Sequence, residues 1–531
     1  MAAFGAIVVA FAIYSPSLSG QFVYDDLNLP FLNDRYARLP FSAWIAGVRP
    51  MLMASYWVNF QIGGLDTTSY HVFNVLFHAL NAVLVGLAVR KLAGGNEAWL
   101  GLLAGALFVA HPLNTEAVSY VASRSENLTV LLFLGAFVAF LYRRSREIDW
   151  GTAAVVLVLF GMACLSKEYA VTLPVLLLLT DLYFNEAGPK SNWRVYAPVA
   201  LGALAGVYFV WGVLTKSTTA GFGLKDLSAS DYFFTQCRAI WVYVLKFFVP
   251  VGLNVDYDFA ISRSLMDHGA VIGLVALVAV SGAAFWFRKE FPLASYGWFV
   301  FLLLLAPTSS FVPIADVLVE RRAYLPSFGL LLIVAEIARR VPVQRLAWVV
   351  PVAVFAVLTF GRNQLWADPI ALWKDAAEKS PKKWRVQFQV ADALYRNGDC
   401  AQAAAAFEQT SKLDKPDYRV LINWAHALDC SGQAEPALAK AQEALQLEQT
   451  GQAYAFVGMQ HAKAKRYDEA LTALNQAIAK DPNFDPAYAY RGNVYALQGD
   501  MERAAADYKR AVELNPSNDM AARGLARANR R

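Results

Sequence analysis

Apolar runs recur along the first two thirds of the chain and are separated by short polar stretches. A helix needs about 20 apolar residues to cross the hydrocarbon core of a bilayer, and several of these runs approach that length. We expect spanning helices near residues 3–18, 70–89, 97–113, 127–142, 151–166, 169–185, 195–214, 270–287, 292–307, 326–338 and 346–361. The pattern therefore predicts an all-α, polytopic membrane bundle of about eleven helices over residues 1–361.

Basic residues between these runs indicate the topology, because cytoplasmic loops carry an excess of Lys and Arg. The clusters all fall on the inner side if the N-terminus is inside and residues 232–250 do not cross. Lys246 and Pro250 interrupt that segment, so we expect it to re-enter or to lie in the interface. The outer side then holds the region after residue 361 and the loops at 19–69, 114–126, 215–269 and 308–325.

From about residue 380 the pattern changes to amphipathic helices with a repeat. Gly398, Gly432, Lys465 and Gly499 follow one another at steps of 34, 33 and 34 residues. This is the period of the tetratricopeptide repeat, in which paired helices stack into a solenoid with a concave surface. We expect a linker at 362–379, then four repeats and a capping helix at 380–531. The surface would bind an extended peptide or a partner protein, with a passive stabilising module as the alternative.

Composition supports a membrane protein with a soluble part. Hydrophobic residues make up 57% of the 531 positions and charged residues 17%, against about 25% charge in ordinary soluble domains. The net charge of +5 is spread along the chain and gives no nucleic-acid signal. The four cysteines form no metal-binding pattern, but Cys400 and Cys430 would meet at one edge of the repeats. On the outer side they are expected to form a disulfide.

Polar residues gather at the predicted outer ends of the apolar runs. Asp25 and Asp26, in the stretch Q-F-V-Y-D-D, directly follow the first run. An ionisable pair at the mouth of a membrane domain is costly to desolvate and marks a candidate site, although a solvated loop is the alternative. The other candidate substrate-binding residues at this face are Arg49, His71, His111, Glu116, Arg124, Lys167, Glu168, Arg321 and Arg322.

Acids and bases on one membrane face suit the transfer of a group from a phosphate-linked lipid. Lys and Arg would hold the phosphate, and a carboxylate would act as general base on an acceptor hydroxyl. Paired acids can hold a divalent metal. Because nearby cations already compensate a leaving phosphate, we expect no obligatory metal or other cofactor.

Several motifs together resemble one known family. They are Q-F-V-Y-D-D, the run from Arg49 to Tyr56, H-V-F-N-V-L-F-H from His71, H-P-L-N-T-E-A-V with S-R-S-E, S-K-E, and E-R-R-A-Y-L-P-S. This combination, followed by the repeats, is similar to the transmembrane and tetratricopeptide-repeat O-mannosyltransferases of the GT-C superfamily. The resemblance covers nearly the whole chain. The chain differs from the family in having only four repeats, and the first two match the repeat pattern weakly.

The resemblance implies a polyprenyl-phosphate sugar donor, inversion at the sugar carbon and a protein Ser or Thr acceptor. It makes Asp25 the general base, and Asp26 would orient the acceptor or support the base. Glu116 and Glu168 would then support the site or contact the acceptor. The candidates for the phosphate are Arg49, Arg124, Lys167, Arg321 and Arg322.

The compact loops and short repeats indicate a bacterial protein of the inner membrane, with the site and the repeats in the periplasm. The sugar is expected to be a hexose such as mannose. Two other functions stay open at this point. One is a GT-C transferase with a lipid or cell-envelope glycan as acceptor, and the other is a non-catalytic scaffold that presents the repeats to partners.

Overall fold

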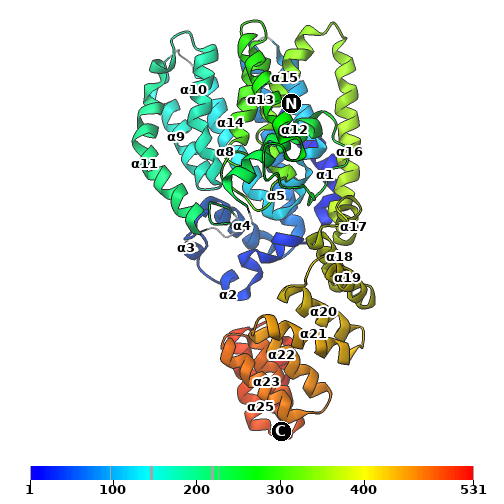
Figure 1. Cartoon of the computed structure of the whole chain (residues 1–531). Coiled ribbons are helices and arrows are strands. Elements are labelled where there is room, and N and C mark those ends of the chain that lie inside the picture. Colours follow the sequence, from blue (N-terminus) through cyan, green and yellow to red (C-terminus); the bar gives the residue numbers. More distant parts are fainter. Residues whose placement is uncertain (1, 96, 144–146, 217–219, 225–226, 530–531) are drawn as a thin grey trace. The chain divides into compact units, whose positions relative to one another are not determined.

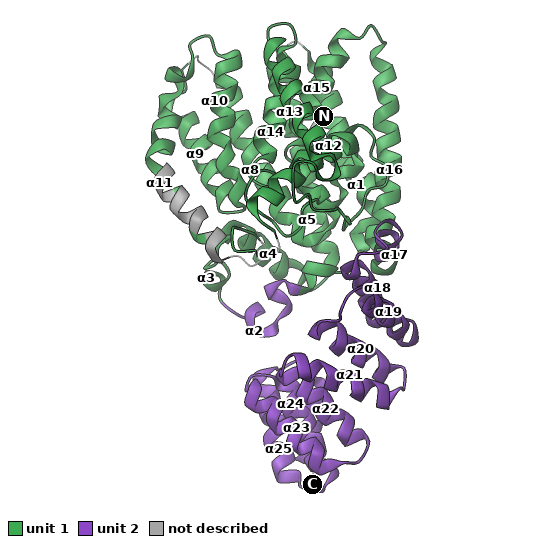
Figure 2. Ribbon diagram, viewed as in Figure 1, with its two compact units in different colours: residues 1–27, 40–372 green, residues 28–39, 373–531 purple. Residues whose placement is uncertain are grey.

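The computed structural model describes residues 2–95, 97–143, 147–216, 220–224 and 227–529. The described residues form helices and loops without a β-strand, which confirms the all-α class (Figure 1). The chain divides into two compact units, one of residues 1–27 and 40–372, the other of residues 28–39 and 373–531 (Figure 2). Helix α17 (Pro369–Lys379) overlaps the region expected to be a linker.

The first unit is a bundle of apolar helices. Its helices are α1 (Ala2–Tyr14), α3 (Phe41–Trp44), α4 (Pro50–Gly63), α5 (Thr67–Leu92), α6 (Ala98–Ala110), α7 (Thr115–Ser119), α8 (Arg124–Leu141), α9 (Trp150–Cys164), α10 (Leu173–Phe184), α11 (Trp193–Lys216), α12 (Ala229–Phe248), α13 (Ala270–Trp286), α14 (Pro292–Leu305), α15 (Ser327–Arg340) and α16 (Val349–Ala367). One hydrophobic core runs through most of them. Small residues permit close approach: a Cβ on Gly297 in α14 would lie 2.4 Å from the carbonyl oxygen of Gly329 in α15.

The expected number of about eleven spanning helices is not confirmed. Among the described residues, four helical stretches are long and apolar enough to cross a membrane, namely Thr67–Leu92, Val121–Leu141, Asp267–Trp286 and Arg345–Ala367. Ala98–Ala110 and Pro112–Ser119 make a fifth if this pair, bent by 54°, is one span. The other expected spans fall on shorter or more polar helices, or, for 195–214, on a helix with several side chains outside the described residues.

Residues 232–250 form most of α12, which does not meet the same criterion of length and apolar character. Its amphipathic sequence combines apolar positions with Arg238 and with Lys246, whose ammonium group donates to the backbone carbonyl of Gly252 at 3.1 Å. Whether this segment re-enters or lies in the interface stays a prediction.

The second unit consists mainly of paired helices. They are α18 (Trp384–Arg396), α19 (Cys400–Leu413), α20 (Tyr418–Cys430), α21 (Ala434–Leu447), α22 (Gly451–Lys463), α23 (Tyr467–Lys480), α24 (Asp485–Leu497), α25 (Met501–Leu514) and α26 (Asp519–Ala528), with the short α2 (Asp34–Ala37) in its other segment. Alanines recur in the second helix of each pair, and all four are fully buried, at positions 403, 437, 470 and 504.

The repeated glycines have a backbone reason. Gly398, Gly432 and Gly499 follow the first helix of their pairs with φ of +89°, +82° and +87°. This left-handed conformation ends a helix and suits glycine, which has no Cβ to clash. Lys465 occupies the equivalent turn at a φ of +60°, so the third pair carries strain that the others avoid.

The expected disulfide is present. Cys400, the first residue of α19, is joined to Cys430, the last residue of α20, with their Cα atoms 5.6 Å apart. Cys237 is buried among apolar residues and Cys164 is half-buried, as expected for cysteines that act as small packing residues.

Candidate functional site

The two acids of the Q-F-V-Y-D-D stretch have opposite environments. Both lie in a single short 3₁₀ turn, Tyr24–Asn28, that follows α1. Asp25 is exposed, whereas Asp26 is fully buried. Tyr24 adopts a φ of +50°, which a residue with a side chain rarely does. Strain of this kind is retained where the surrounding structure holds a segment in place, and it often marks functional segments.

Asp26 fastens this turn to the segment between α7 and α8. One carboxylate oxygen accepts the backbone N–H of Ala122 at 2.6 Å, and the other accepts that of Val23 at 3.1 Å. Burial raises the pKa of Asp26 to about 8, although the two backbone donors favour its ionised form. Asp26 therefore holds the turn, and its buried carboxyl group is not placed to reach a substrate.

Tyr120 also holds the turn in place, and the sequence analysis did not identify it. Its phenolic oxygen accepts the backbone N–H of Asp25 at 2.8 Å, and its ring stacks on that of Trp366 at 5.8 Å. Burial, with the charges of Asp26 and Asp25, raises the pKa of the Tyr120 hydroxyl. A tyrosine in the short V-S-Y-V stretch carries no motif of its own, so only the fold reveals its position.

Three cation–carboxylate pairs lie in the same compact unit as this turn. Each joins a predicted phosphate-binding residue to an acid from another part of the chain: Arg49 with Glu168, Lys167 with Glu126, and Arg321 with Glu116. The Arg49 pair is bidentate, with two hydrogen bonds of 2.9 Å. Glu126 had been noted only as part of a loop motif. The side chains of all three cations are partly exposed, Arg49 at 38%, Lys167 at 19% and Arg321 at 22%.

The charges of several of these groups influence one another. Burial lowers the pKa of Lys167, and the positive charges of Arg49 and Arg321 lower it further, against the effect of Glu126. The charge of Arg321 also acts on Tyr120 beside Asp25. Burial opposes the ionisation of Glu168, but its hydrogen bonds with Arg49 outweigh this and lower its pKa. Of the predicted residues, Arg49, Glu116, Lys167, Glu168 and Arg321 therefore form ion pairs in the same unit as Asp25 and Asp26.

Arg124 is placed differently from the other basic candidates. Its side chain is fully buried and donates to neutral oxygens, at 2.8 Å to Asn74 and 2.9 Å to the carbonyl of Tyr70, and also to Asn59. Its guanidinium carbon lies 4.7 Å from the centre of the Tyr56 ring. Arg124 thus links α4, α5 and α8, and this conformation leaves no guanidinium surface for the predicted phosphate contact.

The two histidines and Arg322 make structural contacts. His71 lies 3.1 Å from the carbonyl oxygen of Gly20, just before the acidic turn. His111 lies 2.8 Å from the carbonyl oxygen of Phe247 and caps the following turn through Leu113. The side chain of Arg322 donates to the hydroxyl of Tyr232 at 3.1 Å and to backbone carbonyls of its own loop. Their substrate contacts stay predictions.

A further ion pair of this unit is buried. Glu320, which the sequence analysis did not count among the site residues, pairs with Arg362 of α16 at 2.9 Å, and both side chains are below 10% exposure. Arg362 also donates to Thr115 of α7 at 3.0 Å, and Glu320 accepts the hydroxyl of Tyr257 at 2.7 Å. This network joins α7, α16 and the loops before α13 and α15. No group of three or more potential metal ligands converges among the residues that the structure describes.

Comparison with known proteins identifies relatives of the whole chain. Family models described as tetratricopeptide or TPR repeats match residues 358–418, 458–499 and 486–518. The human protein O-mannosyl-transferase TMTC3 is 24% identical over 88% of this chain, and its mouse counterpart is 23% identical over 96%. Over most of its length this chain is similar to protein O-mannosyl-transferases. It spans 58% and 64% of the length of those two relatives.

Other relatives share shorter stretches. The Drosophila melanogaster protein O-mannosyl-transferase Tmtc1 is 30% identical to this chain, over 47% of this chain and 32% of the fly protein. Among solved structures, one match is the TPR protein YrrB, described as having an unusual peptide-binding site. The matched region is 33% of this chain and 91% of the YrrB chain, with 22% identity and a TM-score of 0.27. A structure of the MamA protein matches over 28% of this chain and 81% of the MamA chain, with 20% identity and a TM-score of 0.25.

Proposed function

We propose that this protein is a membrane glycosyltransferase that moves a hexose such as mannose from a polyprenyl phosphate to Ser or Thr hydroxyls of proteins. The observation that carries the proposal is the exposed Asp25 on a turn that Tyr120 and Asp26 hold, in the same helical unit as the partly exposed cations Arg49, Lys167 and Arg321. The names of its relatives, protein O-mannosyl-transferases, support the same reaction class.

In the proposed step, Asp25 acts as general base. Its carboxylate takes the proton of the acceptor hydroxyl while the hydroxyl oxygen bonds to the anomeric carbon. The bond between that carbon and the phosphate oxygen breaks, and the phosphate leaves with the electron pair. Attack from the side opposite the phosphate inverts the sugar carbon. The cations Arg49, Lys167 and Arg321 stabilise the charge on the leaving phosphate.

Each of the three cations already has a carboxylate partner. A phosphate that binds these cations must share or replace Glu168, Glu126 or Glu116. The pairs keep the cations in place when no donor is bound and limit the cost of burying positive charge. No metal is needed to neutralise the phosphate in this scheme.

The repeats would present the acceptor protein to the site. We place the site and the repeats on the outer side of a bacterial inner membrane, where the lipid is undecaprenyl phosphate. The Cys400–Cys430 disulfide supports this side, because such bonds persist in oxidising compartments such as the periplasm.

The test is sugar transfer by purified protein from labelled polyprenyl-phosphate mannose to a periplasmic protein extract. Wild type is compared with Asp25→Asn, and with Glu290→Gln, which changes an exposed acid in the loop between α13 and α14. We expect Asp25→Asn to lose transfer by about 100-fold or more, the contribution of a general base, and Glu290→Gln to match wild type. Transfer only to lipid or glycan would reject the protein acceptor, and transfer that survives Asp25→Asn would reject the base.

A further inference from the structure

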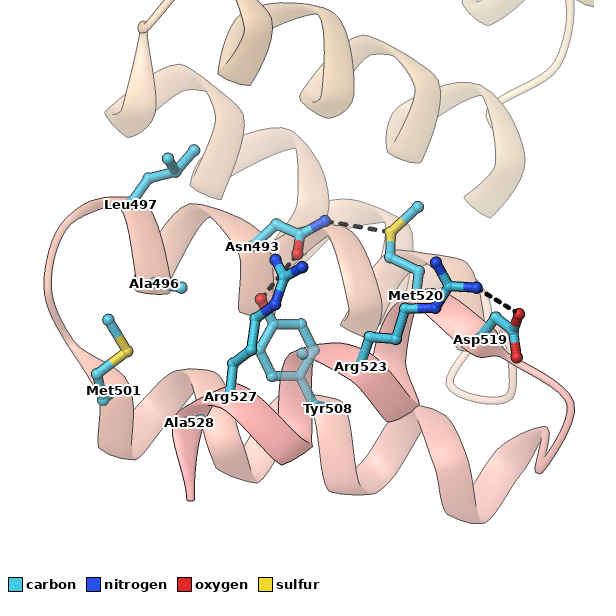
Figure 3. Close-up of a pocket in the computed structure, with 11 residues that line it drawn as sticks. Asn493, Ala496, Leu497, Met501, Tyr508, Asp519, Met520, Arg523, Arg527 and Ala528 are labelled. Carbon is cyan, nitrogen blue, oxygen red and sulfur yellow. Dashed lines mark hydrogen bonds and ion pairs between the residues drawn. The ribbon is translucent and has the colours of Figure 1, made fainter. Parts of the chain in front are cut away.

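A pocket of about 880 Å³ opens between α24, α25 and α26 of the repeat unit (Figure 3). This volume is in the range of ligand-binding clefts, roughly 300–1,000 Å³. Its lining combines apolar and polar groups, of which Asn493, Leu497, Tyr508, Met520, Arg523 and Arg527 matter here. None of these residues belongs to the candidate transfer site.

The base of the pocket is built by a glycine and an aromatic ring. A Cβ on Gly524 would lie 2.6 Å from the ring of Tyr508, so only glycine lets α26 rest on that ring. The Tyr508 hydroxyl donates to the side-chain oxygen of Asn493 at 2.7 Å. This bond orients the amide so that its NH₂ group faces the sulfur of Met520 at 3.1 Å. Because a thioether is a weak acceptor, the amide keeps a donor for a stronger one.

Two arginines stand one turn apart on the same side of α26. In Figure 3, Arg523 and Arg527 both extend from α26 toward α24, and Arg527 approaches Asn493. Arg523 pairs with Asp519 at 3.0 Å, but the two side chains are 74% and 83% exposed. Such a solvated pair is weak and is easily exchanged for another carboxylate. Arg527 has no carboxylate at ion-pair distance among the residues that the structure describes.

Exposed apolar groups complete the lining. Leu497 is 62% exposed and Met520 45% exposed, so both are accessible to a bound segment. Methionine adapts its shape to varied apolar partners. The ring of Tyr508 is almost fully buried and offers no face on which a nucleic-acid base could stack. The lining therefore suits a chain that carries both apolar and negatively charged side chains.

We propose that this pocket binds an extended acidic peptide segment, with its carboxylates on Arg523 and Arg527 and an apolar side chain against Leu497 and Met520. Guanidinium groups bind carboxylates through paired hydrogen bonds, and Asn493 adds a further donor. The role of the segment, as part of the protein that receives the sugar, rests on the proposed function. The binding itself does not.

The test is peptide binding to the full-length protein in non-ionic detergent, followed by fluorescence anisotropy. The probes are a labelled octapeptide that alternates leucine with glutamate and its twin with glutamine. We expect the glutamate peptide to bind at least about tenfold more tightly, and this preference to fall with added salt. Equal binding of the two peptides would overturn the proposal.

Matched variants locate the binding. The double variant Arg523→Gln with Arg527→Gln should lose the preference for glutamate, and so should Leu497→Glu, which places a carboxylate inside the pocket. Arg510→Gln on α25 removes an exposed arginine that pairs with Glu513 and does not line the pocket, and it should bind as wild type does. Wild-type binding by the double variant would overturn the assignment.

The two proposals fail separately. Asp25→Asn should bind the glutamate peptide as tightly as wild type, because the binding assay needs no sugar donor. Peptide binding without any sugar transfer would reject the proposed function and leave the pocket assignment standing. Sugar transfer by a protein that shows no preference for the glutamate peptide would reject the pocket assignment and leave the proposed function standing.

Discussion

The phenolic oxygen of Tyr120 lies 2.8 Å from the backbone nitrogen of Asp25, across 95 residues of sequence. Two positions further along the chain, the backbone N–H of Ala122 donates to the carboxylate of Asp26. One short segment between α7 and α8 therefore forms hydrogen bonds with both acids of the turn. This arrangement separates the roles of the two neighbours: Asp26 and Tyr120 hold the turn, and Asp25 is left exposed on it.

Replacing Tyr120 by Phe should reduce transfer while leaving the fold intact. The change removes the acceptor of the Asp25 N–H, at a cost of about 1 kcal/mol, and keeps the ring that stacks on Trp366. We expect kcat to fall about tenfold, with KM for the donor little changed. Tyr142→Phe, which removes a hydroxyl that donates to the carbonyl of Leu87, is the control. Equal kinetics for Tyr120→Phe and wild type would show that the hydrogen bond between Tyr120 and the Asp25 backbone does not contribute to transfer.

Stability should fall as pH rises because of Asp26. Its pKa is raised in the folded state to about 8 from an ordinary value of 3.8, so between these values the folded protein keeps a proton that the unfolded chain releases. The stabilisation is complete below about pH 4 and is lost progressively as pH rises toward 8. Thermal unfolding in detergent between pH 5 and 9 should show a smaller decline for Asp26→Asn than for wild type. Parallel declines would contradict the assignment.

Arg124 and Arg49 should respond in opposite ways to loss of charge. Arg124→Gln removes a buried cation with several hydrogen bonds and should destabilise the bundle by on the order of 3 kcal/mol. Arg49→Gln breaks a partly exposed pair, so we expect stability within about 1 kcal/mol of wild type and a higher KM for the donor. Unfolding midpoints and donor titrations measure both. A stable Arg124→Gln with impaired donor binding would restore Arg124 as a phosphate ligand.

Lys465→Gly should stabilise the repeat unit. The backbone of Lys465 has a φ of +60°, which costs a residue with a Cβ about 1 kcal/mol relative to glycine. The neighbouring Ala464→Gly serves as control, because Ala464 has a φ of −78° and glycine there only adds freedom to the unfolded chain. Chemical denaturation followed by circular dichroism should shift the two variants in opposite directions. A destabilised Lys465→Gly would mean that the side chain makes a contact worth more than the strain.

The disulfide predicts which thiols react. In protein purified without reductant and then unfolded, a thiol reagent should label Cys164 and Cys237 and leave Cys400 and Cys430 unlabelled. Cys430→Ser should cost about 2–4 kcal/mol of stability, because the bond closes a loop in the unfolded chain. Cys164→Ser is the matched control. Labelling of all four cysteines would place the repeats in a reducing compartment and contradict the topology.

Features that depend on local spacing could be predicted from the sequence. The helical repeats follow from a period of 33 to 34 residues, since each pair of helices packs mainly against its neighbours. The left-handed turns at Gly398, Gly432 and Gly499 and the pairing of Cys400 with Cys430 follow from the same period. The acidic turn after the first apolar run was also visible, because charge beside an apolar helix stands out in one dimension.

Which polar side chains meet, and which are buried, depends on how distant segments pack and could not be predicted from spacing. Asp25 and Asp26 are adjacent and chemically alike, yet one is exposed and the other fully enclosed. Tyr120 and the buried Glu320–Arg362 pair gain their positions from contacts between distant segments. Apolar runs likewise could not reveal where helices end or bend, as at the 54° break before α7. Hydrophobicity specifies that a segment is buried, but the packing of its neighbours decides which atoms it faces.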